Sequence, residues 1–410
     1  MDERIFLPDV YELKSNVLRW LNTLRIGNSG FEYKFSPGTS SSLFTTCFAL
    51  YILDLFKETD NLSLEEKKEW TNYINSFQSE SDGLFYPNPQ YHPDKERDVF
   101  QASCFCLSAL SILESKPKYR ISIVDQWRTR DNVEQYLKER GCHLGKSGSG
   151  NKAMFQAILL THEYERDKDH VLLESINSWF DFHDRFQNSS GFWGKGRQGR
   201  LYKGLQNALH QFVIYEYWNR NYPRIEQVAQ TALKLNDQEG FFSHLPGGDS
   251  CKEYDSLHLL LYFYKDSLKL IEPVLEKAIG ALITRWNEDG GFCENPTRPF
   301  KSNYTQLMAF IFNAQNNEIR ITRGINVLKE IIKPKKHNTR KWIKESQPWS
   351  ESTLWDTWFR CLSIAEISCF IDSNYYKRYR FHKHIGLGFN HYKQYNSFLN
   401  LSKYSFPERN

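Results

Sequence analysis

The sequence predicts an all-α protein, folded as a single α/α toroid of six to seven helical hairpins. Two observations support this prediction. A glycine with an aromatic residue close behind it recurs about every fifty residues along the 410-residue chain. Between these glycines, an amphipathic segment alternates with a segment that is apolar on nearly all sides. A fixed period of this length is typical of stacked units that cannot bury their apolar faces alone.

The glycine loops set the period. Gly30, Gly83, Gly191, Gly240 and Gly290 are 53, 108, 49 and 50 residues apart. The long interval contains a further copy without its aromatic residue, which begins at Gly141. A seventh copy, without its glycine, begins at Pro348.

The amphipathic segments predict outer helices, with one buried face and one solvated face. Each has apolar residues at helical spacing and charges between them. They are residues 10–24, 63–77, 124–141, 172–186, 224–236, 271–286 and 321–333.

The segments that follow the glycine loops predict inner helices, covered on both sides, because their apolar residues extend round the whole helix. Examples are residues 100–113, 257–268 and 354–370. A closed ring buries all of these faces. An open superhelical solenoid is the alternative, but its last repeat should be a polar cap, and residues 354–370 are apolar.

The composition and charge of the chain argue against several functional classes. The net charge is only +4, so a basic face for nucleic acid is not expected. No apolar stretch reaches the ~20 residues of a spanning helix, and the first ten residues do not resemble a signal peptide. Eight cysteines lie mostly in apolar helical segments, where a thiol acts as a small hydrophobe. A cytoplasmic protein with reduced thiols is therefore the expectation.

Residues 371–410 break the repeat, so we expect a toroid over residues 1–370 and a separate tail. The tail is basic and rich in aromatic residues. We expect it to pack across the closure of the ring. The same composition also suits peripheral contact with a membrane surface or an anionic ligand.

Polar residues occur in the first turns of the inner helices, where buried helices are normally apolar. Isolated polar groups there cost stability unless they are paired, so a ring of them predicts a binding site at the mouth of the toroid. Helix capping accounts for part of the set. The candidate residues are Gln101, Lys152, Asn207, His210, Glu253, Asp255, His258, Asp356 and Arg360.

Asp255 and His258 stand three residues apart, on one helix face, with Glu253 close by. A carboxyl group beside an imidazole predicts a pair that can donate and accept a proton, and a buried ion pair is the structural alternative. Asp249, Cys251 and His258 could also be read as a zinc set. No further cysteine or histidine pair supports that interpretation, so we expect neither metal nor cofactor.

The glycine loops and two motifs resemble the prenyltransferase and squalene oxidase repeat of squalene-hopene cyclases, other class II terpene cyclases and protein prenyltransferase β subunits. Leu354, Trp355, Asp356 and Thr357 match the cyclase stretch S-P-V-W-D-T-A-L. KEYDSLHLLLYF resembles the D-x-D-D-T-A segment, with Glu253 at the first acid, Asp255 at the protonating acid and Ser256 in place of the last acid.

The resemblance also has departures. Most class II cyclases carry two toroids, and this chain has room for one. The β subunits have one toroid and an Asp-x-Cys pair like Asp249 and Cys251, but their third zinc ligand, a histidine one repeat later, is absent from KSNYTQLMAF.

Three functions follow as hypotheses. The first is a terpenoid-cyclase-like enzyme that protonates an isoprenoid with Asp255, assisted by His258, while aromatic side chains face the cation. These aromatic residues include Phe242, Tyr254, Trp355 and Trp358. The second is a carbohydrate-active toroid that uses Asp255 and Asp356, with Tyr254, His210 and Arg360 as partners. The third is a binding toroid without catalysis, which the serine at position 256 would favour.

Overall fold

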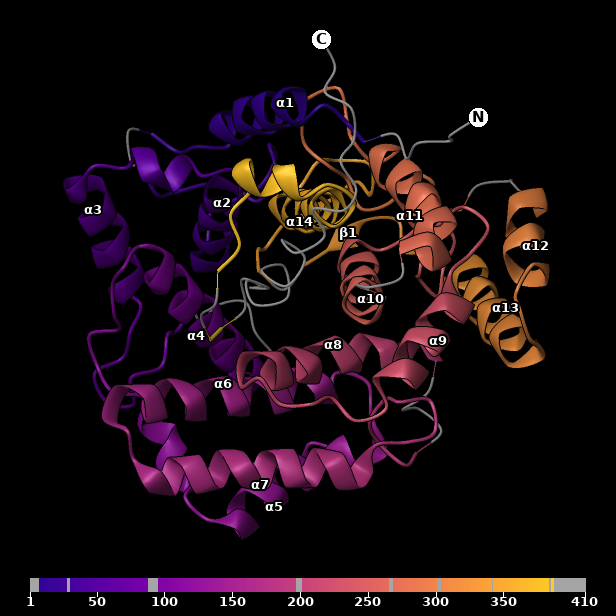
Figure 1. The fold of residues 1–410 in the computed structure, drawn as a ribbon. Helices are drawn as coiled ribbons and strands as arrows, with labels where there is room; N and C mark the ends of the chain where they lie inside the picture. Colours follow the sequence, from indigo (N-terminus) through magenta and orange to yellow (C-terminus); the bar gives the residue numbers. More distant parts are fainter. Residues whose placement is uncertain are drawn as a thin grey trace.

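The computed structural model describes residues 7–27, 30–87, 95–196, 201–264, 268–300, 304–340, 342–382 and 385–386. Within these residues, six inner helices form a closed ring, each packed against the next and the last against the first (Figure 1). They are α2 (Leu43–Leu55), α4 (Lys95–Ile112), α6 (Ser149–Asp167), α8 (Leu201–Tyr217), α10 (Ser250–Phe263) and α14 (Leu354–Ile371). The predicted all-α toroid is confirmed.

The inner helices are covered on all sides, as their composition predicts. On α14, every residue from Leu354 to Cys369 is buried. Such helices have no solvated face to place polar residues on, so each buried polar side chain must find a partner inside the protein.

The outer helices bury one stripe each. In α1, the buried residues Val10, Leu13, Val17 and Leu21 follow helical spacing, and α9 behaves in the same way. The outer helices are α1 (Val10–Thr23), α3 (Leu64–Asn75), α5 (Arg130–Glu139), α7 (His170–Phe186), α9 (Ile225–Leu235) and α11 (Leu268–Ile283).

Glycine is required where a loop touches the next outer segment. Gly240 has φ +100°, and a Cβ there would lie 2.5 Å from the carbonyl oxygen of Lys277 on α11. Gly290 has φ +99°, and a Cβ would lie 2.3 Å from the carbonyl oxygen of Asn16 on α1. Only glycine adopts this backbone freely and leaves room for the contact. The period of the sequence is therefore the period of these joints.

In two of the glycine loops, a glutamine side chain hydrogen bonds to the backbone. Gln78 Nε2 donates to the carbonyl oxygens of Gly83 (2.7 Å) and Tyr119 (2.8 Å). Gln187 Nε2 donates to the carbonyl oxygens of Gly191 and Pro223 in the same way. Each amide thus ties its own glycine loop to the segment that leads into the next hairpin.

The ring closes between its first and last hairpins. The amide of Leu354 donates to the carbonyl oxygen of Phe35 at 2.9 Å, and α14 packs against α2. In Figure 1, the orange-yellow end of the chain returns to the indigo beginning. The sixth inner position belongs to α14, and the ring has six hairpins.

The repeat predicted after Gly290 is wrong in one respect. Its expected inner helix, α12 (Tyr304–Phe312), and the next expected outer helix, α13 (Asn317–Ile332), are not part of the ring. They form a hairpin that projects from the side of the toroid (Figure 1). Their small apolar cluster of Leu307, Phe310 and Val327 is separate from the main core.

Arg323 attaches this hairpin to the ring. Its buried guanidinium donates to Tyr202 Oη (2.8 Å) and to the carbonyl oxygens of Phe310 (2.8 Å) and Leu235 (3.1 Å). One charged side chain therefore connects α13, α12, α8 and the end of α9.

The chain between α13 and α14 folds back over the ring. Two short antiparallel strands, β1 (Asn338–Thr339) and β2 (Ser346–Gln347), bracket the segment that carries Trp342. The indole of Trp342 packs against Phe48 of α2 and Trp355 of α14, with ring centroids 5.2 and 4.2 Å apart. Glu345 accepts a hydrogen bond from Ser40 Oγ at 2.9 Å, just before α2.

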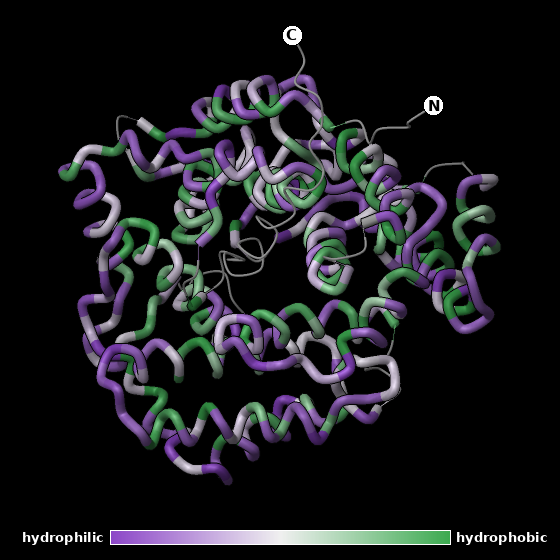
Figure 2. The backbone as a smooth tube through the Cα atoms, viewed as in Figure 1, coloured by the Kyte–Doolittle hydropathy of each residue, from purple (hydrophilic) through white to green (hydrophobic). Residues whose placement is uncertain are grey.

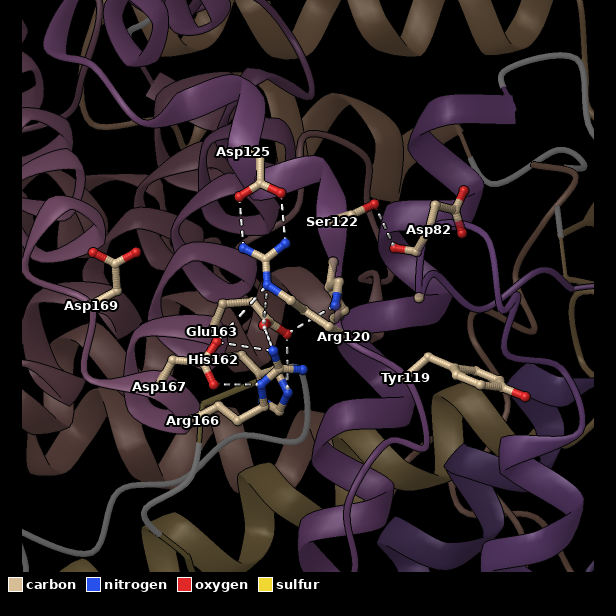
Figure 3. A network of polar contacts seen from close by, with 12 residues as sticks. Asp82, Tyr119, Arg120, Ser122, Asp125, His162, Glu163, Arg166, Asp167 and Asp169 are labelled. Atoms are coloured by element: carbon tan, nitrogen blue, oxygen red, sulfur yellow. Dashed lines mark hydrogen bonds and ion pairs between the residues drawn. The ribbon is translucent and has the colours of Figure 1, made fainter.

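An ion-pair network fixes the segment before α5 (Figure 3). Arg120 binds both oxygens of Asp125 at 2.6 Å, and Glu163 of α6 accepts from the amide of Ile121 at 3.0 Å. Arg166 lies 3.1 Å from the Glu163 carboxylate. The 3-10 helix η3 (Ser122–Trp127) is held against the inner helix in this way.

The tail begins with the 3-10 helix η6 (Ser373–Lys377). Arg380 then contacts Asp54 (3.2 Å) and Thr59 (3.0 Å), beside the 3-10 helix η1 (Glu58–Asn61). This part of the tail therefore lies on the first hairpin. Residues 383–384 and 387–410 are outside the described part of the chain.

Candidate functional site

The starts of α10 and α14 meet, because these two inner helices are neighbours in the ring. Each follows a loop that turns the chain into the helix. Glu253, Asp255, Asp356 and Arg360 are brought to this region, and all four side chains are buried. The sequence predicted these four residues for one site, although more than a hundred positions separate the two motifs.

Asp255 differs from its neighbours in having no partner within the described part of the chain. Its side chain is 3 % exposed, and no hydrogen bond reaches its carboxyl group from any described residue. Burial, and secondly the charge of Asp249, raise the pKa of Asp255 well above its ordinary value. Both effects favour the protonated, neutral form of this carboxyl group.

Glu253 is engaged with the backbone of its own loop. Its two oxygens accept hydrogen bonds from the amides of Phe242 (3.3 Å) and Asp249 (2.6 Å). Burial raises the pKa of Glu253 to about 8, and Arg360 opposes the shift. The predicted aromatic residue Phe242 is fully buried beside this carboxyl group.

Asp356 joins the two helix starts. One oxygen accepts from Thr353 Oγ1 at 2.7 Å, within the N-terminal turn of α14. The other accepts from Ser250 Oγ of α10 at 2.6 Å and lies 3.4 Å from Arg340. The Ser250 bond holds α14 against α10, whereas Thr353 caps α14 and Arg340 belongs to the segment before it. The tetrapeptide that resembles the cyclases therefore has a structural role here.

Arg360 hydrogen bonds to backbone carbonyl groups. It is fully buried, and it donates to the carbonyl oxygens of Cys293 (3.1 Å) and Glu294 (2.8 Å). These carbonyls belong to the loop that follows Gly290. Arg360 thereby fixes that loop to α14.

His258 does not hydrogen bond to Asp255. Its Nδ1 lies 3.2 Å from each oxygen of Glu366 on α14, and its Nε2 lies 3.4 Å from Glu216 on α8. Tyr254 donates to the same Glu366 at 3.0 Å. Burial alone would lower the pKa of His258, but the two carboxylates outweigh it and raise the pKa to about 10. The imidazole is therefore a buried cation between three helices.

Aromatic side chains from α2, α4, α14 and the returning segment form one cluster. Trp355, which is 9 % exposed, lies 4.5 Å from Phe359 between ring centroids, and Trp358 stacks on Phe48 at 5.7 Å. Tyr254 reaches Phe359 at 5.5 Å and connects α10 to the cluster. Electron-rich ring faces of this kind can stabilise a cation.

The other predicted residues come from α4, α6 and α8. Asn207 is occupied by backbone, because it accepts from the amide of Gly150 (3.0 Å) and donates to the carbonyl of Lys146 (3.1 Å). His210 is half-buried on α8, and withdrawal from water lowers its pKa to about 4. Gln101 is buried on α4, and Lys152 is half-buried on α6.

Two cations paired with carboxylates at this site were missed in the sequence analysis. Lys252 forms an ion pair with Asp249, and although burial opposes the shift, this lysine lowers the pKa of Asp249. Arg340 pairs with Glu294, whose pKa burial raises to about 7. Lys252 stands beside Glu253 in the sequence and could have been noticed. Arg340 lies in a segment without the repeat, and no sequence signal marks it.

The candidate zinc ligands do not come together. Cys251 Sγ donates to Asp249 at 3.1 Å, whereas His258 faces Glu366 and Glu216. Among the described residues, no group of three or more His, Cys, Asp and Glu side chains has an arrangement suited to a metal ion. The residues present therefore do not fit the zinc site of the prenyltransferase β subunits.

A cavity of about 440 Å³ is lined by other residues. Its walls come from the loops after Gly240 and Gly290 and from α12, and none of the predicted site residues contributes to them. The lining residues are Pro246, Pro296, Thr297, Arg298, Pro299, Phe300, Gln306 and Leu307.

Comparison with solved structures returns proteins of several activities. A glycosyl hydrolase of family 88 from Bacteroides vulgatus has 11 % identity and a TM-score of 0.49, over 88 % of this chain and 99 % of that one. A variant of the type II terpene cyclase MstE from Scytonema, in complex with its product merosterolic acid A, has 13 % identity and a TM-score of 0.47, over 88 % and 98 %. A polysaccharide lyase has 13 % identity and a TM-score of 0.42, over 80 % and 100 %.

No curated protein sequence matches this chain. The sequence profile of the prenyltransferase alpha-alpha toroid domain matches in two overlapping stretches, residues 6–152 and 104–352. These stretches cover five of the six hairpins completely and the sixth up to the start of α14. The protein is therefore a member of the prenyltransferase alpha-alpha toroid family.

Proposed function

We propose that this protein is a cyclase that starts a carbocation reaction of an isoprenoid by protonating it with Asp255. The observation that carries the proposal is the carboxyl group of Asp255, which is buried and has a raised pKa. It accepts no hydrogen bond from any described residue. A general acid needs a proton to give and a free direction in which to give it.

The reaction balances without a cofactor. The proton of Asp255 adds to an alkene carbon or an epoxide oxygen of the substrate. The cation that forms is attacked by a second double bond of the same substrate molecule. Loss of a proton from carbon ends the reaction, so the product is an isomer of the substrate. Asp255 is left as a carboxylate and takes a new proton from solvent.

The aromatic cluster supports this chemistry. Trp355 and Phe359 lie on α14, the inner helix that packs against α10, and Phe359 contacts Tyr254, the residue before the acid. A ring face contributes about 2 kcal/mol or more toward a desolvated cation. Such a wall suits a hydrocarbon substrate whose charge moves along the chain.

The carbohydrate hypothesis is less well supported by the same groups. It needs Asp356 as the second carboxylate and Arg360 as a sugar ligand. Asp356 already bonds to Thr353, Ser250 and Arg340, and Arg360 bonds to backbone carbonyls. A sugar could use Asp356 only if its bond to Ser250 of α10 opened, and Arg360 only if its bonds to the loop after Gly290 opened.

The test is Asp255→Asn, assayed with acyclic polyprenyl substrates of several lengths and head groups. We expect turnover to fall by a factor of at least ~100, with an unchanged melting temperature, because asparagine keeps the shape of the side chain. Ser256→Ala is the matched control on the same helix, since among the described residues its hydroxyl bonds back to the Lys252 carbonyl alone. It should remain active.

Isotope labelling tests the protonation step directly. In deuterated water, the wild-type product should carry a deuterium on carbon when an alkene is protonated. A cyclic product without deuterium, from a substrate that lacks an epoxide, would exclude this mechanism. Thermal stabilisation by oligosaccharides and not by isoprenoids would favour the carbohydrate hypothesis instead.

A further inference from the structure

The projecting α12–α13 hairpin carries an unusual amount of exposed apolar surface. On α12, the exposed residues Tyr304, Met308 and Phe312 are four positions apart and form one row along the helix. Each is 51–70 % exposed. Leu307 and Phe310, on the other side of the helix, are buried.

The second helix repeats the pattern. On α13, Ile321, Ile325, Leu328 and Ile332 are spaced by four, three and four residues, which places them in one row. They are 49–65 % exposed, while Val327 packs inward. Green positions are visible along both helices of the hairpin in Figure 2. Soluble proteins seldom leave rows of this kind in water without a use for them.

The charge at the end of the apolar row on α13 is positive. Lys329, Lys333, Lys335 and Lys336 are all exposed at the end of α13 and directly after it. The acidic residue Glu330 is occupied by an ion pair with Arg298 at 2.6 Å. Apolar rows with a lysine border on a short amphipathic hairpin are typical of segments that lie in a membrane interface.

We propose that the α12–α13 hairpin docks this protein on the surface of a membrane with acidic headgroups. The apolar rows enter the boundary between headgroups and acyl chains, and the lysines bind the lipid phosphates. No described helix has the length and hydrophobicity required to cross a bilayer, so the contact is peripheral. The hairpin is an insertion in the ring, and it can enter lipid without disturbing the toroid.

Charge complementarity favours a lipid surface over a second copy of the chain. In a self-complementary dimer the patch would face itself, so the same excess of lysines would lie on both sides. An acidic membrane neutralises them. The inference does not depend on the proposed catalytic function.

The experiment is flotation of the full-length protein with phosphatidylcholine vesicles, with and without phosphatidylglycerol. We expect binding to the acidic vesicles to exceed binding to the neutral ones, by about fivefold for each lysine that reaches the surface. High salt should weaken it. Equal binding to both vesicles, or no binding to either, would overturn the proposal.

Two sets of substitutions separate the apolar and ionic contributions. A combined variant of the apolar rows should lose flotation, and a variant of the lysines should lose the preference for phosphatidylglycerol. The first set is Met308→Ser, Phe312→Ser, Ile325→Ser and Leu328→Ser, and the second is Lys333→Gln, Lys335→Gln and Lys336→Gln. Leu64→Ser is the control, because Leu64 is an exposed leucine on α3.

Circular dichroism and melting temperature should be the same for all variants, since every substituted side chain is solvent-exposed. Unchanged flotation of the combined apolar variant contradicts the proposal. So does a dimer in gel filtration that the same variant dissociates, because the face would then bind a second copy.

Discussion

His258 should be a main source of stability in the core, and replacing it with glutamine tests this. The imidazolium lies between the carboxylates of Glu366 and Glu216 with no exposed surface. Its pKa is raised from 6.5 to about 10, a difference that corresponds to about 5 kcal/mol at 1.36 kcal/mol per unit. Removal of one member of a buried ion pair costs about 3–5 kcal/mol. We therefore expect His258→Gln to lower the free energy of unfolding by about 3–5 kcal/mol at pH 6.5.

The pH dependence has a defined sign. A histidine with a raised pKa contributes its full stabilisation below its unfolded pKa and loses it as the pH rises through the folded value. The difference between wild type and His258→Gln should thus be largest near pH 6.5 and should shrink toward pH 10. Urea denaturation followed by circular dichroism at several pH values measures this.

His183 supplies a matched control. It is also a buried histidine, on α7, but burial lowers its pKa to about 3. It is neutral in the folded protein, so the stability change in His183→Gln should be constant above pH 6.5. A second control is Glu366→Gln combined with His258→Gln, which should recover part of the loss. The difference in free energy of unfolding between wild type and His258→Gln decides the case. If it does not vary between pH 6.5 and 10, or stays below about 1 kcal/mol, His258 is not a buried cation.

Three further changes test the architecture. Gly290→Ala should destabilise the ring by about 1–3 kcal/mol, because the new methyl group meets the Asn16 carbonyl in a left-handed backbone; thermal melts will show whether the melting temperature falls. Gln78→Leu leaves the buried carbonyl of Gly83 without its donor and should lower the free energy of unfolding by about 1–3 kcal/mol. An unchanged urea midpoint would show that this glutamine does not stabilise the loop. Arg323→Ala should release the α12–α13 hairpin while the ring stays folded, so hydrogen exchange should speed up in residues 304–332 and not in α6; uniform exchange would refute a separate attachment.

The ring was predictable because its signals are local. The glycine in each loop is required by a backbone conformation and a close contact. The buried face of each helix follows from the spacing of its apolar residues. The assignment of α12 failed for the same reason. A nine-residue apolar helix after a glycine loop has the pattern of an inner helix, and nothing in its own residues shows that α14 takes the place in the ring.

The site was predictable only in outline. Asp255 and Glu253 share one helix turn, so sequence brings them together. Glu366, the partner of His258, could not be found in this way, because it is 108 residues away in the sequence. The two side chains meet only because α10 packs on α14. Trp342 and Arg340 lie in a connecting segment whose path depends on the whole ring.

The contact of α14 with the first hairpin sets the order in which the molecule can form. The bond between Leu354 and Phe35, together with the packing of α14 against α2, joins two segments that are about 300 residues apart. During synthesis, one apolar side of α2 stays uncovered until α14 has left the ribosome. Fragments that end before residue 354 have at most five of these hairpins and leave the ring open, so they should aggregate and be degraded quickly in the cell.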